Sequence, residues 1–219
     1  MIITTPSLVV KKLLDLIVKG TVKPGDKLPS TDRIARETGT SIISAREAIK
    51  NLATIGVIEI RHGRGIFILN GRPVIEELLE ARKVIECYNA MMAAQHADPQ
   101  MLKDLEKLLV TMDEDIRRGD AESYSGKDYN FHLSLGMGSG NRILLKTLEN
   151  IRSLLQYLLL AINRVPGNLE KSSLLHWGLF TAISNKDSGS ASSIMAQHID
   201  DATTAWKKYN ESICRQEED

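Results

Sequence analysis

The sequence predicts a mostly α-helical protein in two parts, and three observations support this fold class. Apolar residues recur at helical spacing up to about residue 55, and two short β-like runs follow around a glycine-rich connection. Beyond residue 73 the helical periodicity continues, without the period-two alternation that indicates strands. Aromatic residues make up only 5% of the chain, which argues against a sheet-rich sandwich. We therefore expect three helices with a two-stranded hairpin, followed by an all-α bundle.

Turn and capping residues bound the first three helices. Gly20, Gly39 and Gly56 stand where each helix should end, since glycine readily adopts the left-handed conformation of a helix C-terminus. Pro24 and its neighbours form a turn, and Ser41 is suited to cap the third helix. We expect these helices over residues 7–20, 29–39 and 41–55.

Two β-like runs cover residues 57–60 and 66–69, and Arg61-His62-Gly63-Arg64-Gly65 connects them. Three helices followed by a basic two-stranded hairpin form the winged helix-turn-helix pattern, in which the hairpin is the wing. The first part is therefore expected to bind DNA.

Residues 70–73 give the best domain boundary, because Asn, Gly and Pro interrupt regular structure there. We expect a DNA-binding domain over residues 1–70, a linker over 71–75 and an all-helical domain over 76–219. The helices of that second domain are expected near residues 74–96, 99–118, 120–137, 141–164, 168–185 and 188–212.

Charge and composition narrow the class of protein. Residues 1–70 carry eleven Lys and Arg and six Asp and Glu, a net of +5, and the remainder carries −5. The basic part favours an anionic polymer as partner, although a solvated helix face could also hold the charge. Two distant cysteines, Cys87 and Cys214, exclude a disulfide framework and a cysteine-ligated zinc finger. No basic leader precedes the first apolar residues, and no apolar run could span a bilayer, so we expect a cytoplasmic protein.

The third helix and the wing offer the residues expected to contact DNA. From the helix start and its exposed side these are Ser41, Ile42, Ser44, Arg46 and Lys50, and from the wing His62, Gly63 and Arg64. Arg46 could read a guanine through two hydrogen bonds, or it could form a surface ion pair with Glu47.

Three histidines and one aspartate form a second constellation. Asp128 and His132 lie four residues apart, so both project from one helix face. His176 and His198 come from two later helices and could complete a set of metal ligands in the core of the bundle. The alternative is three partly buried histidines, each with its own hydrogen bond.

The segment up to residue 69 contains a series of short motifs: Pro24-Gly25-Asp26-Lys27-Leu28-Pro29-Ser30, Ile34-Ala35, Ser41, Arg46-Glu47-Ala48-Ile49, Leu52, Gly56 and Arg61-His62-Gly63-Arg64-Gly65-Ile66-Phe67-Ile68. In the order and spacing of these motifs, residues 7–69 resemble the DNA-binding domain of the GntR family of bacterial transcription regulators. Two positions depart from the family, since Thr31-Asp32 replaces Glu-Arg and Ile42 replaces the arginine after the serine. The departures imply a shifted operator, with more of the contact made by Arg33 and Arg46.

The second part carries further motifs: Arg82 with Glu86, Asp128-Tyr129-Asn130-Phe131-His132, Gly138-Ser139-Gly140-Asn141, His176 before Ala182-Ile183, and His198. Through them residues 75–213 resemble the FCD-type effector domain of the FadR-like branch of that family, although Leu175 replaces the usual Glu. The resemblance implies that Asp128, His132, His176 and His198 hold a divalent metal ion, with Zn, Ni and Mn among the candidates. It also implies a small carboxylate effector, for which Arg82 and Asn141 are the expected binding residues. Arg82 could instead form a structural ion pair with Glu86.

Together these features predict a homodimeric, ligand-responsive transcription regulator that binds double-stranded operator DNA. We expect it to be a repressor of transcription and not an enzyme. In one alternative the metal itself is the signal, and in another it is only structural. A metal-dependent hydrolase is the remaining alternative, but Glu86 is the sole candidate general base and Arg82 explains it better.

Overall fold

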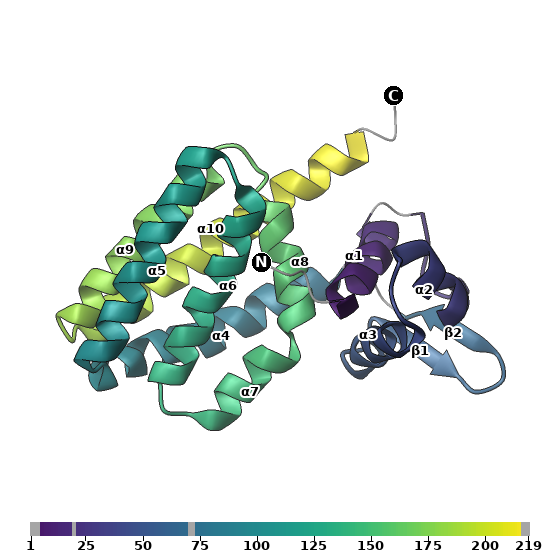
Figure 1. Cartoon of the computed structure of the whole chain (residues 1–219), viewed down its shortest axis with the longest axis horizontal. Helices are drawn as coiled ribbons and strands as arrows, with labels where there is room; N and C mark the ends of the chain where they lie inside the picture. The colour runs from purple at the N-terminus through teal and green to yellow at the C-terminus, as the bar shows by residue number, and fades with distance from the viewer. Residues whose placement is uncertain (1–4, 19–20, 70–72, 216–219) are drawn as a thin grey trace. The chain divides into compact units, whose positions relative to one another are not determined.

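The computed structural model describes residues 5–18, 21–69 and 73–215 and confirms a winged helix-turn-helix followed by an all-helical domain. The chain divides into two compact units, Met1–Glu77 with Asn210–Asp219, and Leu78–Tyr209. Figure 1 shows the elements in order. They are α1 (Thr5–Val18), α2 (Thr31–Thr38), α3 (Ile42–Thr54), β1 (Ile58–Arg61), β2 (Gly65–Ile68), α4 (Pro73–His96), α5 (Pro99–Arg118), α6 (Ala121–Gly138), α7 (Arg142–Asn150), α8 (Arg152–Ile162), α9 (Asn168–Ser184) and α10 (Ser188–Arg215).

In the first unit, helices α1, α2 and α3 pack against one another around an aliphatic core. The core includes Leu13 and Leu14 of α1, Ile34 of α2 and Leu52 of α3, each almost fully buried. The expected capping residue of α3 is in place, since Ser41 Oγ accepts a hydrogen bond from the Ser44 backbone N–H at 3.0 Å.

The wing is an antiparallel hairpin in which Ile58 pairs with Ile68 and Arg61 pairs with Gly65. Its strands therefore begin and end one residue away from the expected runs of 57–60 and 66–69. The segment before α2 pairs with the other edge of β2, because the Leu28 backbone N–H donates to the Ile66 carbonyl at 2.8 Å. This pairing fixes the wing to the three-helix body.

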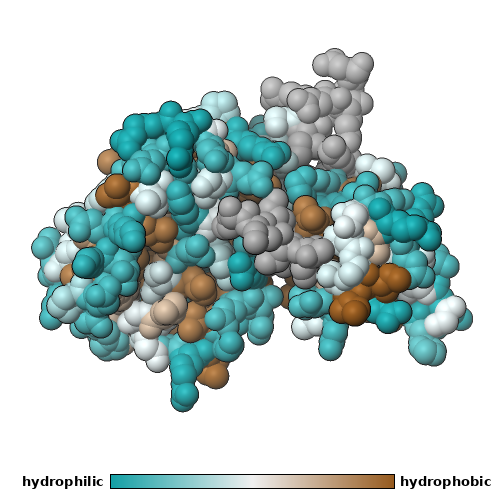
Figure 2. Space-filling view, viewed as in Figure 1, coloured by the Kyte–Doolittle hydropathy of each residue, from teal (hydrophilic) through white to brown (hydrophobic). Residues whose placement is uncertain are grey.

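In the second unit, α6 lies at the centre, and α5, α7 and α8 pack against it. Helix α9 packs against α5. Tyr124 and Phe131 of α6 are completely buried, as is Leu155 of α8. Figure 2 shows that most of the surface in that view is hydrophilic, with apolar residues in separate patches.

The helix expected over residues 141–164 is instead two helices, α7 and α8, which meet at Ile151. The sequence has no glycine or proline at this break. Packing is the physical reason, because α7 and α8 both lie against α6 and bury Leu148 and Leu155 there. The bend at Ile151 (φ −92°, ψ 8°) lets two straight segments follow one partner helix.

The bounds of the other expected helices differ from those in the structure by three residues or fewer. Helix α4 begins at Pro73, so residues 73–75 of the expected linker are helical, whereas residues 70–72 and Gly20 lie outside the described residues. In the described part of the chain, no helix is both long and apolar enough to cross a membrane.

Candidate metal centre and DNA-binding surface

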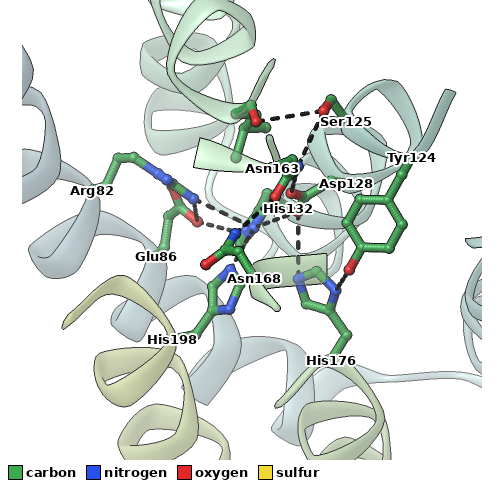
Figure 3. A network of polar contacts seen from close by, with 11 residues as sticks. Arg82, Glu86, Tyr124, Ser125, Asp128, His132, Asn163, Asn168, His176 and His198 are labelled. Atoms are coloured by element: carbon green, nitrogen blue, oxygen red, sulfur yellow. Dashed lines mark hydrogen bonds and ion pairs between the residues drawn. The ribbon is translucent and has the colours of Figure 1, made fainter. Parts of the chain in front are cut away.

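The four predicted metal ligands come together in the buried core of the second unit. Asp128 and His132 come from α6, His176 from α9 and His198 from α10. One ligand atom from each residue lies within 4.8 Å of the others, and all four side chains are buried. Figure 3 shows the side chains directed toward one another. The spacing of Asp128 and His132 predicted the first pair, and the packing of α9 and α10 brings in the other two.

The distances within the cluster show that the nitrogen and oxygen atoms that could bind a metal converge on one point. His132 Nε2 lies 3.2 Å from Asp128 Oδ1 and 3.2 Å from His198 Nε2, and His176 Nε2 lies 3.4 Å from Asp128 Oδ1. Asp128 Oδ1 and His176 Nε2 are buried and have no hydrogen-bond partner. Leaving such atoms unpaired costs about 1–3 kcal/mol each. Three imidazole nitrogens and a carboxylate oxygen fit a divalent cation, which would satisfy both atoms.

A shell of polar groups orients the four side chains from behind. His132 Nδ1 lies 2.5 Å from Glu86 Oε2, and His176 Nδ1 lies 3.4 Å from the Tyr124 hydroxyl. Asn163 Nδ2 donates to Asp128 Oδ2 at 3.2 Å. Because these contacts use the outer atoms of the cluster, the inner atoms remain free to face a common point, as in metal sites whose ligands are oriented by hydrogen bonds from behind.

The electrostatics of the metal-free cluster favour the metal-binding forms of Asp128, His176 and His198, whereas a metal ion would have to displace a proton from His132. Burial lowers the pKa of His176 to about 4 and also lowers that of His198, so both rings are neutral at pH 7. Burial opposes ionisation of Asp128, but the His132 ring beside it and the other neighbouring imidazoles hold its pKa below the ordinary range. Burial would also lower the pKa of His132, but the Glu86 and Asp128 carboxylates raise it to about 9.

Arg82 forms the ion pair that its spacing from Glu86 predicts. Arg82 Nε donates to Glu86 Oε1 at 2.6 Å, and both side chains are buried. Arg82 Nη2 also lies 3.3 Å from His132 Nε2, which places the guanidinium at the edge of the cluster. Arg82 Nη1 is buried and has no hydrogen-bond partner. The structural pairing of Arg82 therefore leaves one donor unused.

A small cavity adjoins the cluster on the side of α9 and α10. It has a volume of about 10 Å³, and its lining includes Asp128, His198, Asn168 and Lys171. Lys171 Nζ is ion-paired at 2.7 Å with Asp201, which also lines the cavity. The volume is close to that of one water molecule, so in this form the cavity has no room for a larger ligand.

Asn141 does not line this cavity. Its Oδ1 atom accepts hydrogen bonds from the backbone N–H groups of Ile143 at 3.1 Å and Leu144 at 3.2 Å, so Asn141 caps helix α7. It borders a separate, open surface depression together with Tyr88, Arg142 and Lys146. The motif that suggested an effector contact thus marks a helix start in this structure.

The predicted DNA contacts lie on two exposed regions of the first unit. Arg46 and Lys50 are exposed on α3, and within the described residues no acid forms an ion pair with Arg46. The alternative ion pair with Glu47 is therefore not formed. Arg33 differs, because its Nε donates to Glu37 Oε1 at 2.8 Å.

The other predicted DNA contacts lie at the start of α3 and in the wing. At the start of α3, Ser41 and Ile42 are exposed, and the Ser44 hydroxyl lies 2.9 Å from that of Ser41. In the wing, His62, Gly63 and Arg64 form the exposed turn between the strands, with Gly63 at φ +70°.

Sequence reasoning missed Ile43, a large apolar residue exposed on α3. Ile43 is 78% exposed, compared with 44% for Ile42. Its position was available from helical spacing, because it lies opposite the buried row of Ala45, Ala48 and Leu52. The roles of Tyr124 and Asn163 behind the cluster were also missed, and they depend on contacts over more than thirty residues of sequence.

Comparison with known proteins identifies both units. Residues 7–68 match the bacterial regulatory proteins of the gntR family, and residues 77–201 match the FCD domain. The chain is 26% identical over 208 residues to the HTH-type transcriptional regulator LutR of Bacillus subtilis (strain 168), covering 84% of this chain and 93% of LutR. It is 27% identical over 224 residues to the putative L-lactate dehydrogenase operon regulatory protein of Escherichia coli (strain K12), covering 91% of this chain and 85% of that protein.

Solved structures share the fold. Escherichia coli McbR/YncC superposes with a TM-score of 0.68 at 22% identity, covering 95% of this chain and 100% of that chain. Streptococcus agalactiae GntR matches with a TM-score of 0.52 at 25% identity, covering 90% of this chain and 97% of that chain. The matched families and curated relatives are transcription regulators and give no support to the hydrolase alternative. This chain belongs to the GntR family and is a DNA-binding transcription regulator with an FCD domain.

Proposed function

We propose that this regulator binds a divalent metal ion in its FCD domain and, beside that ion, a small carboxylate effector that changes its affinity for operator DNA. The observation that carries the proposal is the convergence of four buried ligand residues, two of whose inner atoms have no hydrogen-bond partner. The two atoms, Asp128 Oδ1 and His176 Nε2, lie 3.4 Å apart, and a cation bound to both would satisfy them.

Asp128, His132, His176 and His198 would hold the ion. A bound divalent cation supplies a Lewis-acidic position that an anionic oxygen can occupy. Zn, Ni and Mn are all compatible with three imidazoles and a carboxylate, and the affinity order alone does not choose among them.

Arg82 would hold the second oxygen of the effector carboxylate. Its Nη1 atom is a buried donor without a partner, and its Nη2 atom lies 3.3 Å from His132 Nε2. A guanidinium binds carboxylates well because its N–H groups form a planar fork. Asn141 is left out of this role because its side chain caps α7.

The size of the cavity links effector binding to regulation. A volume of about 10 Å³ does not admit an organic acid, so entry requires the lining of the cavity, which comes mainly from α8, α9 and α10, to rearrange. A ligand that binds only the opened form shifts the protein toward that form by its differential affinity. In a homodimer on a two-fold symmetric operator, such a shift would change the spacing of the two DNA-binding heads and so the operator affinity. We expect the ligand-free form to be the repressor.

The test uses the full chain after removal of metal by a chelator. Zn, Ni or Mn is added first, and then a panel of small acids that includes L-lactate, since one relative is named for an L-lactate dehydrogenase operon. The readouts are the thermal midpoint and the affinity for a DNA duplex selected by the protein from a random pool. We expect metal to raise the midpoint and an acid to change the affinity only when metal is present.

Two other outcomes would change the proposed role of the metal or contradict the proposed effector site. A change of affinity with metal alone would make the metal the signal. An acid effect that persists in metal-free protein, with Arg82→Lys behaving as wild type, would contradict the proposed site.

A further inference from the structure

The recognition surface of α3 carries an exposed isoleucine where a charged or polar residue would be expected. Ile43 is the second residue of α3, and 78% of it is exposed. Helix α3 follows α2 and is therefore the second helix of the helix-turn-helix, whose N-terminal residues face the edges of bases in the major groove.

Helical spacing places Ile43 in the middle of the surface that faces away from the core. Arg46 and Lys50 stand three and seven residues further on, on the same side of the helix and both exposed. Ile42 is turned instead toward the row of Ala45 and Ile49, both buried, and is less exposed at 44%. The apolar group thus shares its face of the helix with two cations that suit a phosphate backbone.

Neither packing nor helix propensity accounts for an isoleucine at this position. Its side chain is largely outside the core, and a β-branched residue is a weaker helix former than alanine or lysine. In the major groove, the apolar group available on a base edge is the 5-methyl of thymine, and aliphatic side chains recognise it by contact.

We propose that Ile43 packs against the 5-methyl group of a thymine in each operator half-site, and that this contact sets a preference for T·A at that position. The inference rests on the proposed operator binding by α3, and it adds the identity of one base pair. Glu47 lies on the same face, one turn further along, and can accept a hydrogen bond from a cytosine amino group near that thymine.

The experiment removes the methyl group from the DNA and leaves the protein unchanged. The full chain first selects a duplex from a random pool, and each thymine of that duplex is then replaced in turn by deoxyuridine, which lacks only the 5-methyl. We expect one position per half-site where the replacement weakens binding about fourfold. This corresponds to about 0.8 kcal/mol for one buried methyl-sized group, at 1.4 kcal/mol per factor of ten.

A variant completes a double-mutant cycle between protein and DNA. Ile43→Ala should bind the selected duplex more weakly, and the deoxyuridine at the sensitive position should have no further effect on it. Ile143→Ala is the matched control, because Ile143 is 75% exposed on α7 in the FCD domain. It should respond to deoxyuridine as the wild type does.

The outcomes separate this inference from the function on which it rests. A duplex selected with high affinity, but insensitive to deoxyuridine at every thymine, overturns the role of Ile43 and leaves operator binding standing. A position that is equally sensitive in wild type and in Ile43→Ala also overturns it, because the methyl is then read by another residue. Failure to select any sequence contradicts both proposals.

Discussion

Glu86 Oε2 lies 2.5 Å from His132 Nδ1, while the other oxygen of Glu86 accepts a hydrogen bond from Arg82 at 2.6 Å. One buried carboxylate therefore orients a candidate metal ligand and also balances the charge of a buried guanidinium. This relationship joins α4 to α6 and explains why the Arg82–Glu86 spacing and the Asp128–His132 spacing belong to one site.

The first prediction concerns Glu86→Gln. Loss of the carboxylate should reduce metal affinity about 10–100-fold, because His132 loses the partner that fixes its ring. It should also lower the free energy of unfolding by about 3–5 kcal/mol, since Arg82 is left as a buried charge without a counter-ion. Metal affinity is measured by competition with a chelating dye, and stability by urea unfolding.

Glu80→Gln is the matched control, because Glu80 is an exposed acid on the same helix. It should leave both quantities near the wild-type values. Wild-type metal affinity in Glu86→Gln would show that His132 does not need Glu86.

The wing offers a pair of glycines for comparison. Gly65 has φ +118°, and a Cβ added there would lie 2.7 Å from Lys27 Cε, whereas Gly63 has φ +70° and open space around it. Gly65→Ala should cost about 1–3 kcal/mol of stability, and more than Gly63→Ala, because its backbone conformation is harder for an L-residue. Urea unfolding of the two variants measures the difference, and equal losses would count against this account of the wing.

Arg46→Ala tests the recognition helix. If Arg46 reads a base, operator binding should weaken by about 1–3 kcal/mol, and discrimination at one base position should relax. Arg117→Ala, which removes an exposed arginine from α5, should bind like the wild type. The measurement is fluorescence anisotropy at fixed salt, and unchanged affinity in Arg46→Ala would remove this residue from the interface.

Asp115 gives a prediction about pH. Its side chain is completely buried, and its oxygens lie 2.5 Å from Arg118 Nη2 and 2.6 Å from Lys127 Nζ. Burial opposes ionisation, but the hydrogen bonds from Lys127 and Arg118 hold the pKa of Asp115 below its usual value of 3.8. A carboxylate with a lowered folded-state pKa stabilises the fold above its unfolded pKa, and this contribution is lost as pH falls through the folded pKa.

Asp115→Asn should therefore be less stable than wild type at pH 7, and the difference should shrink as the pH falls below about 4. Urea midpoints at pH 7 and pH 3 measure it, with the exposed Asp104→Asn as control. A gap of constant size would mean that the charge of Asp115 contributes nothing.

Local signals were sufficient to predict the winged domain. Gly39 and Ser41 bound α2 and α3 because their preferences act over a few residues, and the glycines of the wing do the same. The break at Ile151 had no such signal, since it results from the fit of α7 and α8 to α6. The conformational preferences of neighbouring residues cannot predict a bend that is imposed by packing against a helix distant in sequence.

The candidate site was predictable only in part, because only some of its contacts are local in sequence. The pairs Arg82–Glu86 and Asp128–His132 follow from spacing within one helix, but the arrival of His176 and His198 depends on how α9 and α10 pack. The resemblance to the FCD domain predicted from the sequence that those two histidines belong to the same ligand set. Asn141 shows the opposite case, because a motif residue proved to be a helix cap.

The most direct test of the account is the metal content of the purified full chain, measured by elemental analysis beside His132→Ala and His96→Ala. His96 is exposed at the end of α4 and serves as the control histidine. We predict about one metal ion per chain in the wild type and in His96→Ala, and none in His132→Ala, because removal of one of four ligands opens the site. Absence of metal from the wild type, even after incubation with zinc, nickel and manganese, would contradict the proposed metal centre.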